Sequence, residues 1–178
     1  TGSGKTSLIN MIPRFYDATN GEVLVNGTNV KEYTEEGLRN KIGIVPQKAV
    51  LFKGTIRSNL LWGNESATEN DLMEALKQAQ SYDFVMQKEN GIDSVVEQNG
   101  RNFSGGQRQR LTIARALVRK PEILILDDSS SALDYTTDAN LRKEIAKLKD
   151  MTVFIVSQRT ASIMDADQIV VLDDGNVM

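Results

Sequence analysis

The first residues of the chain carry the clearest chemistry. Residues 1–7 are Thr-Gly-Ser-Gly-Lys-Thr-Ser, and an apolar helical run follows over residues 8–12. Glycines let a backbone turn tightly and approach a ligand, and the unpaired N–H groups at a helix start favour an anion. The stretch therefore predicts a phosphate loop, in which Lys5 reaches the β and γ phosphates of a nucleotide and the Thr6 hydroxyl coordinates Mg²⁺. Taken alone, a flexible turn with a chance lysine explains the same residues, because the first glycine of the motif G-x-x-x-x-G-K-[ST] would lie two residues before Thr1.

Two carboxylates follow a continuous apolar run. Residues 122–128 are Glu-Ile-Leu-Ile-Leu-Asp-Asp. Such a run is typical of a strand buried on both faces, in the middle of a parallel sheet. Asp127 is then placed to hold Mg²⁺, and Asp128 to face an attacking water. Two acids in a solvated loop are the alternative, but that reading leaves the four apolar residues before them unexplained.

Two further polar positions stand where ligands could bind. Gln47 follows a β-branched strand at residues 42–45, and ligands of open parallel sheets bind beyond the carboxyl ends of the strands, so this amide could reach a metal or its water. Ser104 and the next two glycines open a second helix, where a hydroxyl and unpaired N–H groups can hold an anion. By themselves, Gln47 is more simply an ordinary loop residue and the glycines a turn.

Composition restricts the remaining function classes. With 178 residues, 40% of them hydrophobic, the chain is long enough for one buried core, so we expect a single domain. The net charge of −3 disfavours a nucleic-acid surface, and the absence of cysteine and histidine removes disulfides, thiolate sites and serine–histidine nucleophiles. Apolar runs reach only four residues, against the roughly 20 of a spanning helix. We expect no membrane crossing, and no signal peptide because residue 1 already belongs to the loop.

The elements that would position these residues form an α/β pattern. Apolar alternation or apolar runs predict strands in residues 21–27, 42–45, 122–127, 152–156 and 168–172. The strand at residues 21–27 ends in an Asn-Gly turn signal and is expected to belong to an antiparallel hairpin. Helical periodicity predicts helices in residues 34–40, 56–61, 71–80, 82–87 and 104–121, and one more around Leu141, Ile145 and Leu148. Thr68 and Asp71 are placed as a capping box at the start of the third of these. No strand is expected over residues 48–120, which we interpret as a helical insertion in a core of residues 1–47 and 121–178.

The order of these motifs resembles the nucleotide-binding domain of ATP-binding cassette (ABC) transporters. The resemblance extends over residues 1–178, and includes the turn Ser-Ala-Leu-Asp at residues 131–134. It is most specific where residues 104–110 stand about one helix before the strand at 123–127, an arrangement that other phosphate-loop ATPases lack. Residues 51–60 look like the exporter branch, of the multidrug type, rather than the importers. The resemblance implies an α/β fold with a phosphate-loop (RecA-like) core, a parallel central sheet, a small antiparallel β part and a helical insertion.

The same resemblance implies roles for individual residues. It implies ATP and Mg²⁺ as cofactors, with Thr6, Gln47 and Asp127 toward the metal, and with Gln47, Asp128 and Gln158 taking part in hydrolysis. The positions that it assigns to nucleotide binding are Gly2, Ser3, Gly4, Lys5, Thr6, Ser7, Ser104, Gly105, Gly106, Gln107 and Asp134.

Partners and location also follow from the resemblance. Such domains pair head to tail, with two ATP molecules sandwiched between the phosphate loop of one domain and the signature, here residues 104–107, of the other. The helical insertion rests against a transmembrane domain, which implies a position on the cytoplasmic face of the cell membrane. The strand before the loop and the aromatic residue that stacks on adenine would precede Thr1, so the resemblance implies a fragment of a domain.

Two positions depart from the family pattern and bear on mechanism. The family has glutamate where this chain has Asp128; one methylene fewer withdraws the carboxylate by about 1.5 Å, and a misplacement of about 1 Å can cost on the order of 10²-fold in rate. The family has histidine where this chain has Gln158, a neutral amide that can bond a phosphate oxygen without carrying charge, which costs roughly 10²–10³-fold. We therefore hypothesise one half of a heterodimeric exporter, whose own site hydrolyses slowly or not at all and whose intact signature completes the partner's active site.

Other classes stay open at this point. A homodimeric exporter in which Asp128 and Gln158 suffice for slow turnover fits the same residues. A soluble DNA-associated ABC ATPase is disfavoured because the residues between Gln47 and Ser104 predict compact helices rather than long coiled coils, and no nucleic-acid partner is expected. A phosphate-loop kinase or GTPase switch is disfavoured by the Ser-Gly-Gly-Gln helix start.

Overall fold

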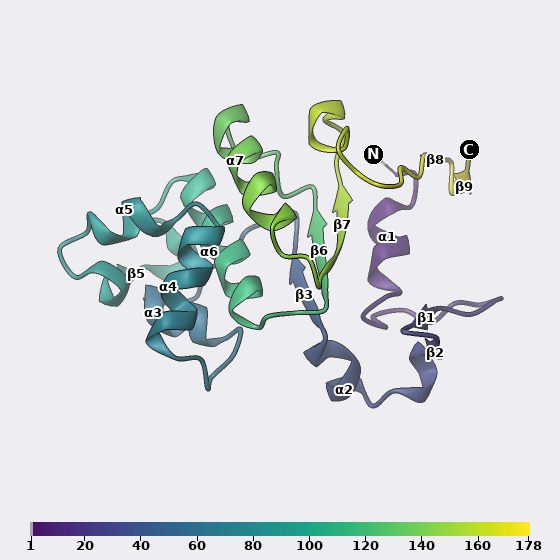
Figure 1. Ribbon diagram of the computed structural model, residues 1–178, viewed down its shortest axis with the longest axis horizontal. Helices are drawn as coiled ribbons and strands as arrows, with labels where there is room; N and C mark the ends of the chain where they lie inside the picture. Colours follow the sequence, from purple (N-terminus) through teal and green to yellow (C-terminus); the bar gives the residue numbers. More distant parts are fainter. Residues whose placement is uncertain (1) are drawn as a thin grey trace.

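A three-stranded parallel sheet lies at the centre of the computed structural model, which describes residues 2–178 (Figure 1). Thr1, the first residue of the predicted phosphate loop, lies outside the described residues. The strands are β3 (Ile42–Val45), β6 (Ile123–Asp127) and β7 (Thr152–Val156), in the order β3-β6-β7. β6 is the middle strand, and Leu124 to Leu126 are at most 3% exposed, as its unbroken apolar run predicts.

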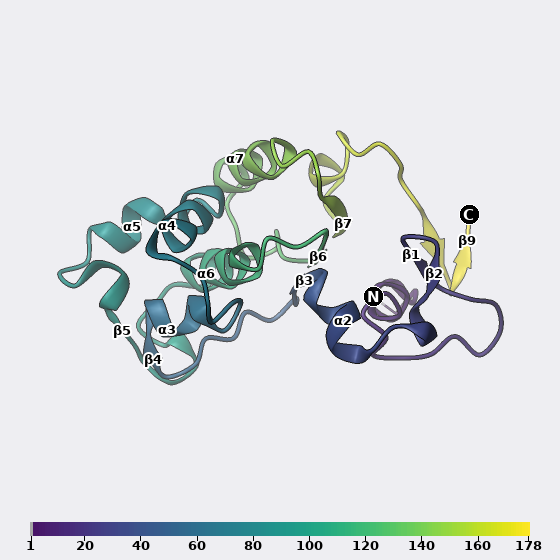
Figure 2. The same cartoon turned by 60° about the horizontal axis from the view of Figure 1, so that its bottom comes forward.

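Helices pack on one side of this sheet and extend away from it (Figures 1 and 2). They are α3 (Ile56–Leu61), α4 (Glu69–Gln78), α5 (Tyr82–Met86), α6 (Gly105–Val118) and α7 (Tyr135–Ala146). α6 contacts β3, α3 and α4, and its apolar face, with Leu111, Ala114, Leu117 and Val118, is buried as predicted. The predicted capping box at the start of α4 is also confirmed, because Thr68 and Asp71 exchange hydrogen bonds there.

The chain before β3 forms a smaller unit on the other side of the sheet. It contains α1 (Lys5–Asn10), the antiparallel strands β1 (Leu24–Val25) and β2 (Thr28–Asn29), and α2 (Glu35–Asn40). The predicted Asn-Gly turn of the hairpin is confirmed: Asn26 and Gly27 have positive φ angles of 50° and 76°. A cluster of buried apolar side chains joins this unit to the sheet: Ile9, Val25, Val30, Leu38, Ile42 and Ile125.

Two strand predictions need correction. Residues 48–120 do contain strands, because β4 (Gly54–Thr55) pairs antiparallel with β5 (Val95–Val96). The paired residues of these two-residue strands are 40 or more positions apart, and such short and distant strands show no sequence pattern. The predicted strand 168–172 is wrong over most of its length: only β8 (Leu172–Asp173) forms, paired with β9 (Asn176–Val177). Ile169, Val170 and Val171 are each more than half exposed, since no described strand pairs with them.

Short 3₁₀ turns complete the described chain, at Val30–Glu32, Gly91–Asp93, Gln98–Gly100 and Thr160–Ser162. Within residues 2–178, every helix is too short or too polar to serve as a membrane-spanning segment.

Candidate functional site

The glycine loop before α1 has the backbone that a phosphate loop requires. Gly2 and Gly4 have φ angles of +98° and +85°, in the left-handed region that side chains disfavour. Gly4 is the N-cap of α1 and has no side chain to bond the first N–H groups of the helix, so those groups are left for a ligand. The Lys5 ammonium donates to the Ser3 hydroxyl at 2.6 Å, so its positive charge lies back over the loop.

The loop meets the end of the central strand through Thr6 and Asp127. The Thr6 hydroxyl donates to the Asp127 carboxylate, at 3.0 Å from one oxygen and 3.2 Å from the other. Asp127 is 8% exposed, and a single hydroxyl hydrogen cannot satisfy both of its oxygens. A hydroxyl and a carboxylate are hard oxygen ligands of the kind that Mg²⁺ prefers, together with phosphate oxygens and waters. The pair predicted to hold the metal is therefore assembled, and its chemistry fits Mg²⁺.

Asp128 and Gln47 form the second pair at this sheet edge. The Gln47 side-chain N–H donates to the Asp128 carboxylate at 3.1 Å. Asp128 has a φ of 46°, and its backbone N–H donates to the Val156 carbonyl at the end of β7, which aims the residue across the sheet edge. Sequence reasoning placed Gln47 toward both the metal and the reaction; its described hydrogen bond is with Asp128, not with Thr6 or Asp127.

Gln158 lies at the same edge, two residues beyond β7, and is exposed. Figure 1 shows the start of α1, the ends of β6 and β7 and the start of α7 gathered along the upper edge of the sheet. The parallel strands β6 and β7 bring Asp127, Asp128 and Gln158 to one edge. α1, which contacts β7, places Lys5 and Thr6 at the same edge.

The second predicted anion site begins α6. The Ser104 hydroxyl accepts the N–H of Gln107 at 3.2 Å, while the Gln107 side chain accepts the N–H of Ser104 at 3.0 Å. This capping box uses the serine oxygen as an acceptor, which leaves its O–H and the N–H groups of Gly105 and Gly106 to face a ligand. A Cβ on Gly106 would lie 3.2 Å from the Ala132 carbonyl oxygen, so the helix start packs closely on the turn after Asp128.

Asp134 ends that turn and caps α7. Its carboxylate accepts the backbone N–H of Thr137 at 2.9 Å and the Thr137 hydroxyl at 2.7 Å, and these bonds hold the pKa of Asp134 below its ordinary value. Asp134 and Ser104 are both exposed. Among residues 2–178, no hydrogen bond joins residues 104–107 or Asp134 to the phosphate loop. The predicted residues therefore form two groups, one around Asp127 and one around the start of α6.

The profile of the ABC transporter family matches residues 1–131 of the chain. The chain belongs to the ABC transporter family. This match confirms the phosphate-loop fold and the family that the order of the motifs predicts.

Relatives and solved structures agree with this assignment to the ABC transporters. The chain is 46% identical over its whole length to an uncharacterized ABC transporter ATP-binding protein of Bacillus subtilis. It is 44% identical to a Staphylococcus aureus protein that is provisionally named a multidrug export ATP-binding/permease protein. It spans 31% of the length of each of these relatives. A solved structure of a bacterial Atm1-family ABC exporter with ATP bound superposes with a TM-score of 0.95 at 36% identity, over 100% of this chain and 32% of that one.

Arg159 is a residue of this sheet edge that the sequence patterns do not single out. Arg159 donates to the carbonyl oxygen of Leu133 at 3.0 Å and to that of Ser131 at 3.1 Å, and its guanidinium lies 5.2 Å from the Tyr135 ring centre. An arginine at a strand end is a weak signal, because its partners are backbone oxygens 26 and 28 residues away, which leave no trace in the sequence.

Proposed function

We propose that this chain is the ATP-binding domain of an ABC exporter and that it couples ATP binding and hydrolysis to transport. The observation that carries the proposal is the Thr6–Asp127 pair, which joins a glycine loop to a buried strand-end carboxylate across 121 residues. The names of the relatives, and the ATP-bound exporter structure, support the same function. Because the chain spans 31% of those relatives, a transmembrane domain elsewhere in the protein would supply the transport pathway, with this domain at the cytoplasmic membrane face.

Each group at the sheet edge has a task in this proposal. Lys5 and the loop N–H groups, from Gly2 to Ser7, bind the phosphates, and Thr6 with Asp127 holds Mg²⁺, which supplies charge neutralisation between the phosphates when bound. Gln47 and Asp128 position the water, and Gln158 bonds the terminal phosphate. Support comes from the common edge on which these side chains lie, with Asp128 held at 3.1 Å by Gln47.

The second group of residues serves a partner domain. Within this chain, no hydrogen bond joins Ser104, Gly105, Gly106, Gln107 or Asp134 to the phosphate loop in the described residues. The Ser104 O–H and the N–H groups of Gly105 and Gly106 remain as donors at the start of α6. We infer that they complete the ATP site of a second ABC domain in a head-to-tail pair, most simply one from a different chain. Residues 1–47 and 121–178 would then act as the ATPase core, and residues 48–120 as the helical part that receives the transmembrane domain.

The site formed by this chain's own loop is inferred to hydrolyse slowly. Asp128 is one methylene shorter than the glutamate of the family, and its carboxylate is tied to Gln47, so it is withdrawn from an attacking water. Gln158 offers a neutral amide where a positive charge would stabilise the transition state. The losses in hydrolysis rate at the two positions do not multiply, because the two groups act as a unit. Binding residues are retained, so this site would keep ATP more than cleave it.

The test is to restore the two family residues in the complete protein that carries this chain. Asp128→Glu together with Gln158→His is expected to raise ATP turnover at least about tenfold, within the 10²-fold range of one misplaced group. Asp150→Glu, an equal extension at an exposed turn, serves as the matched control and is expected to change nothing. If the wild-type protein already turns over as fast as the restored variant, its own site is competent and the homodimeric alternative stands. Lys5→Ala should abolish ATP binding at this site, which separates loss of binding from slow chemistry.

A direct test of pairing uses the absence of cysteine from this chain. A single cysteine introduced by Ser104→Cys is expected to crosslink to a cysteine placed in the phosphate loop of the partner domain, and only when ATP is present. The mass of the crosslinked species shows whether the partner is a second copy or a different chain. No ATP-dependent crosslink would contradict the head-to-tail pair, and the kinase and GTPase alternatives predict that result.

A further inference from the structure

The side chain of Arg159 joins two segments of the site that are far apart in sequence. Its guanidinium donates to the carbonyl oxygens of Ser131 and Leu133, 3.1 and 3.0 Å away. Both carbonyls belong to the turn that begins at Asp128 and ends at Asp134. A planar guanidinium can serve two carbonyls at once, whereas a lysine ammonium cannot match that fork.

Other contacts hold the same two segments together. The Ser157 hydroxyl accepts the backbone N–H of Arg159 at 3.0 Å and lies 3.5 Å from the Ser130 hydroxyl. The backbone N–H of Asp128 donates to Val156 at 2.9 Å. The end of β7, which carries Gln158, is thus fastened to the turn at several points, but Arg159 is the residue whose side chain reaches the far half of the turn.

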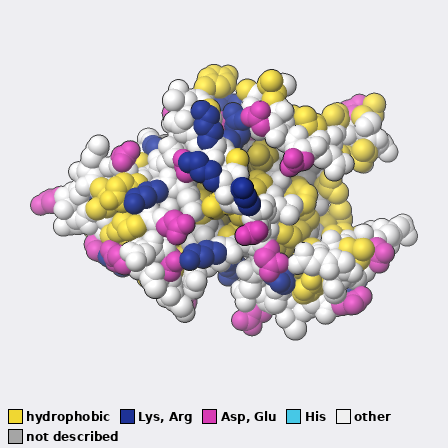
Figure 3. Space-filling view, viewed as in Figure 1, with side chains coloured by type: hydrophobic (Ala, Val, Ile, Leu, Met, Phe, Trp, Pro, Cys, Tyr) yellow, Lys and Arg dark blue, Asp and Glu magenta, His cyan; other side chains and the backbone are white. Residues whose placement is uncertain are grey.

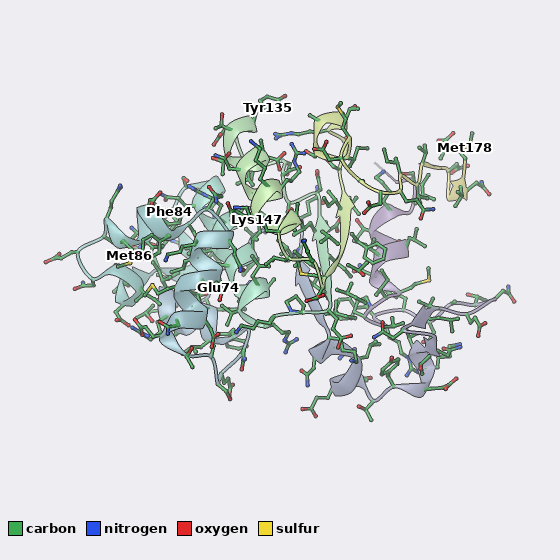
Figure 4. The ribbon with its side chains drawn as sticks, in the orientation of Figure 1. Glu74, Phe84, Met86, Tyr135, Lys147 and Met178 are labelled. Atoms are coloured by element: carbon green, nitrogen blue, oxygen red, sulfur yellow. The ribbon has the colours of Figure 1, made fainter. Side chains whose placement is uncertain are left out.

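In the far half of the turn, Ser131, Ala132 and Asp134 are exposed, whereas the Leu133 side chain is buried. Tyr135, the first residue of α7, is 73% exposed, and its ring covers the Arg159 guanidinium at 5.2 Å. Figure 4 shows Tyr135 at the upper end of α7, away from the body of the domain. In Figure 3, several Lys and Arg side chains lie at the top and along the middle of this face. The Arg159 side chain thus links the end of β7, which carries Gln158, to an exposed surface.

We propose that Arg159 is a positioning residue that couples Gln158 to the far half of this turn, residues 131–134, and to Tyr135 at the start of α7. The inference rests on the proposed function, since it takes Gln158 as the group that contacts the terminal phosphate. Arg159 itself touches neither nucleotide nor metal in this proposal. Its role is to make the placement of Asp134 and Tyr135, on the surface that meets the second domain, depend on whether ATP is bound in this chain's own site.

The test is hydrogen exchange in the complete protein, read on the amides of residues 131–135 with and without Mg·ATP. In the wild type, ATP is expected to slow exchange in this turn, where the Ser131 and Leu133 N–H groups bond within the turn. Arg159→Lys is expected to bind ATP and yet to lose this protection, by about tenfold in exchange rate for one charged hydrogen bond lost. ATP turnover per bound nucleotide should fall about tenfold or more, with the KM for ATP nearly unchanged.

Arg119→Lys is the matched control. Arg119 is also half-buried and also bridges two carbonyl oxygens, of Gly63 at 3.2 Å and Arg39 at 2.9 Å, but far from the sheet edge. A purely structural loss would appear in both variants as a lower melting temperature. Only Arg159→Lys is expected to uncouple the turn from ATP. If that variant does not fold, Arg159→Gln, which keeps a neutral amide donor group, takes its place.

The outcomes separate the two proposals. A wild-type protein that binds no ATP removes the proposed function, and the coupling with it. A wild-type protein that binds ATP without protecting residues 131–135 overturns only the coupling. So does ATP-dependent protection in Arg159→Lys equal to that of the wild type.

Discussion

Replacing Thr6 by valine tests the join between the phosphate loop and the sheet. The substitution keeps the branched shape and removes the hydroxyl that lies 3.0 and 3.2 Å from the two oxygens of Asp127. A hydrogen bond to a charged group contributes about 1.5–3 kcal/mol to stability. Because Thr6 is exposed, water can reach part of the vacated position, and the lower end of that range, about 1.5 kcal/mol, is expected. For a domain of this size the melting temperature should fall by about 3–6 °C.

The assay is thermal unfolding of this domain in the complete protein that carries it, first without nucleotide. Thr6→Ser is the control, because it keeps the hydroxyl and removes only an exposed methyl group; a loss within about 0.5 kcal/mol is expected. In a second series, Mg·ATP at 100 times its Kd should stabilise the wild type by about 2.7 kcal/mol. Thr6→Val should show the gain from ATP in EDTA but not the additional gain from Mg²⁺.

Two results would contradict this role of the Thr6 hydroxyl. If Thr6→Val melts together with the wild type and keeps the full magnesium-dependent gain, the hydroxyl neither satisfies Asp127 nor binds the metal. If Thr6→Ser loses as much as Thr6→Val, the methyl group rather than the hydrogen bond is responsible.

Two further predictions concern packing and charge in the helical part. A Cβ on Gly63 would overlap the carbonyl oxygen of Arg115, so Gly63→Ala should lower the free energy of unfolding by about 1–3 kcal/mol or more. Urea unfolding should show a lower midpoint at an unchanged slope. An unchanged midpoint would show that the turn adjusts to the methyl group without loss of stability. The Lys120 ammonium, 2.6 Å away, and the capping bonds of α4 hold the pKa of Asp71 well below its ordinary value of 3.8. The stabilisation by the ionised Asp71 is therefore present above about pH 4 and is lost as the pH falls further. Asp71→Asn should lower the melting temperature at pH 7, and should lower it by less at pH 3. Glu89→Gln, at an exposed position, is the control. An equal loss at both pH values would contradict the assignment.

Local sequence patterns predicted much of the fold because their causes are local. The run at residues 123–126 needs burial on both faces, and it became the central strand β6. The Asn26-Gly27 turn and the capping box of Thr68 and Asp71 depend on residues at most three positions apart, and both formed. The strand prediction for residues 168–172 went wrong for the opposite reason, since apolar β-branched residues form a strand only where another strand pairs with them.

The residue types of the site were determined by the sequence alone. A phosphate loop needs a tightly turning backbone and positive charge, and the sequence provides them as Gly2, Gly4, Lys5 and Thr6. Both glycines have a positive φ in the structure. The same reasoning identified Asp127 as a strand-end carboxylate, Ser104 with Gln107 at a helix start, and the family to which the motif order belongs.

Only the tertiary structure decided which of these residues meet. Thr6 pairs with Asp127 across 121 residues because α1 packs against β7, beside β6. Gln47 pairs with Asp128 across 81 residues because a parallel sheet brings the carboxyl ends of its strands to one edge. Arg159 reaches the carbonyls of the turn after Asp128 for the same reason, and backbone oxygens have no identity that a sequence could display. The sequence by itself specified the chemical groups and the local bends that present them; the order β3-β6-β7 and the pairing at its edge turned them into a site.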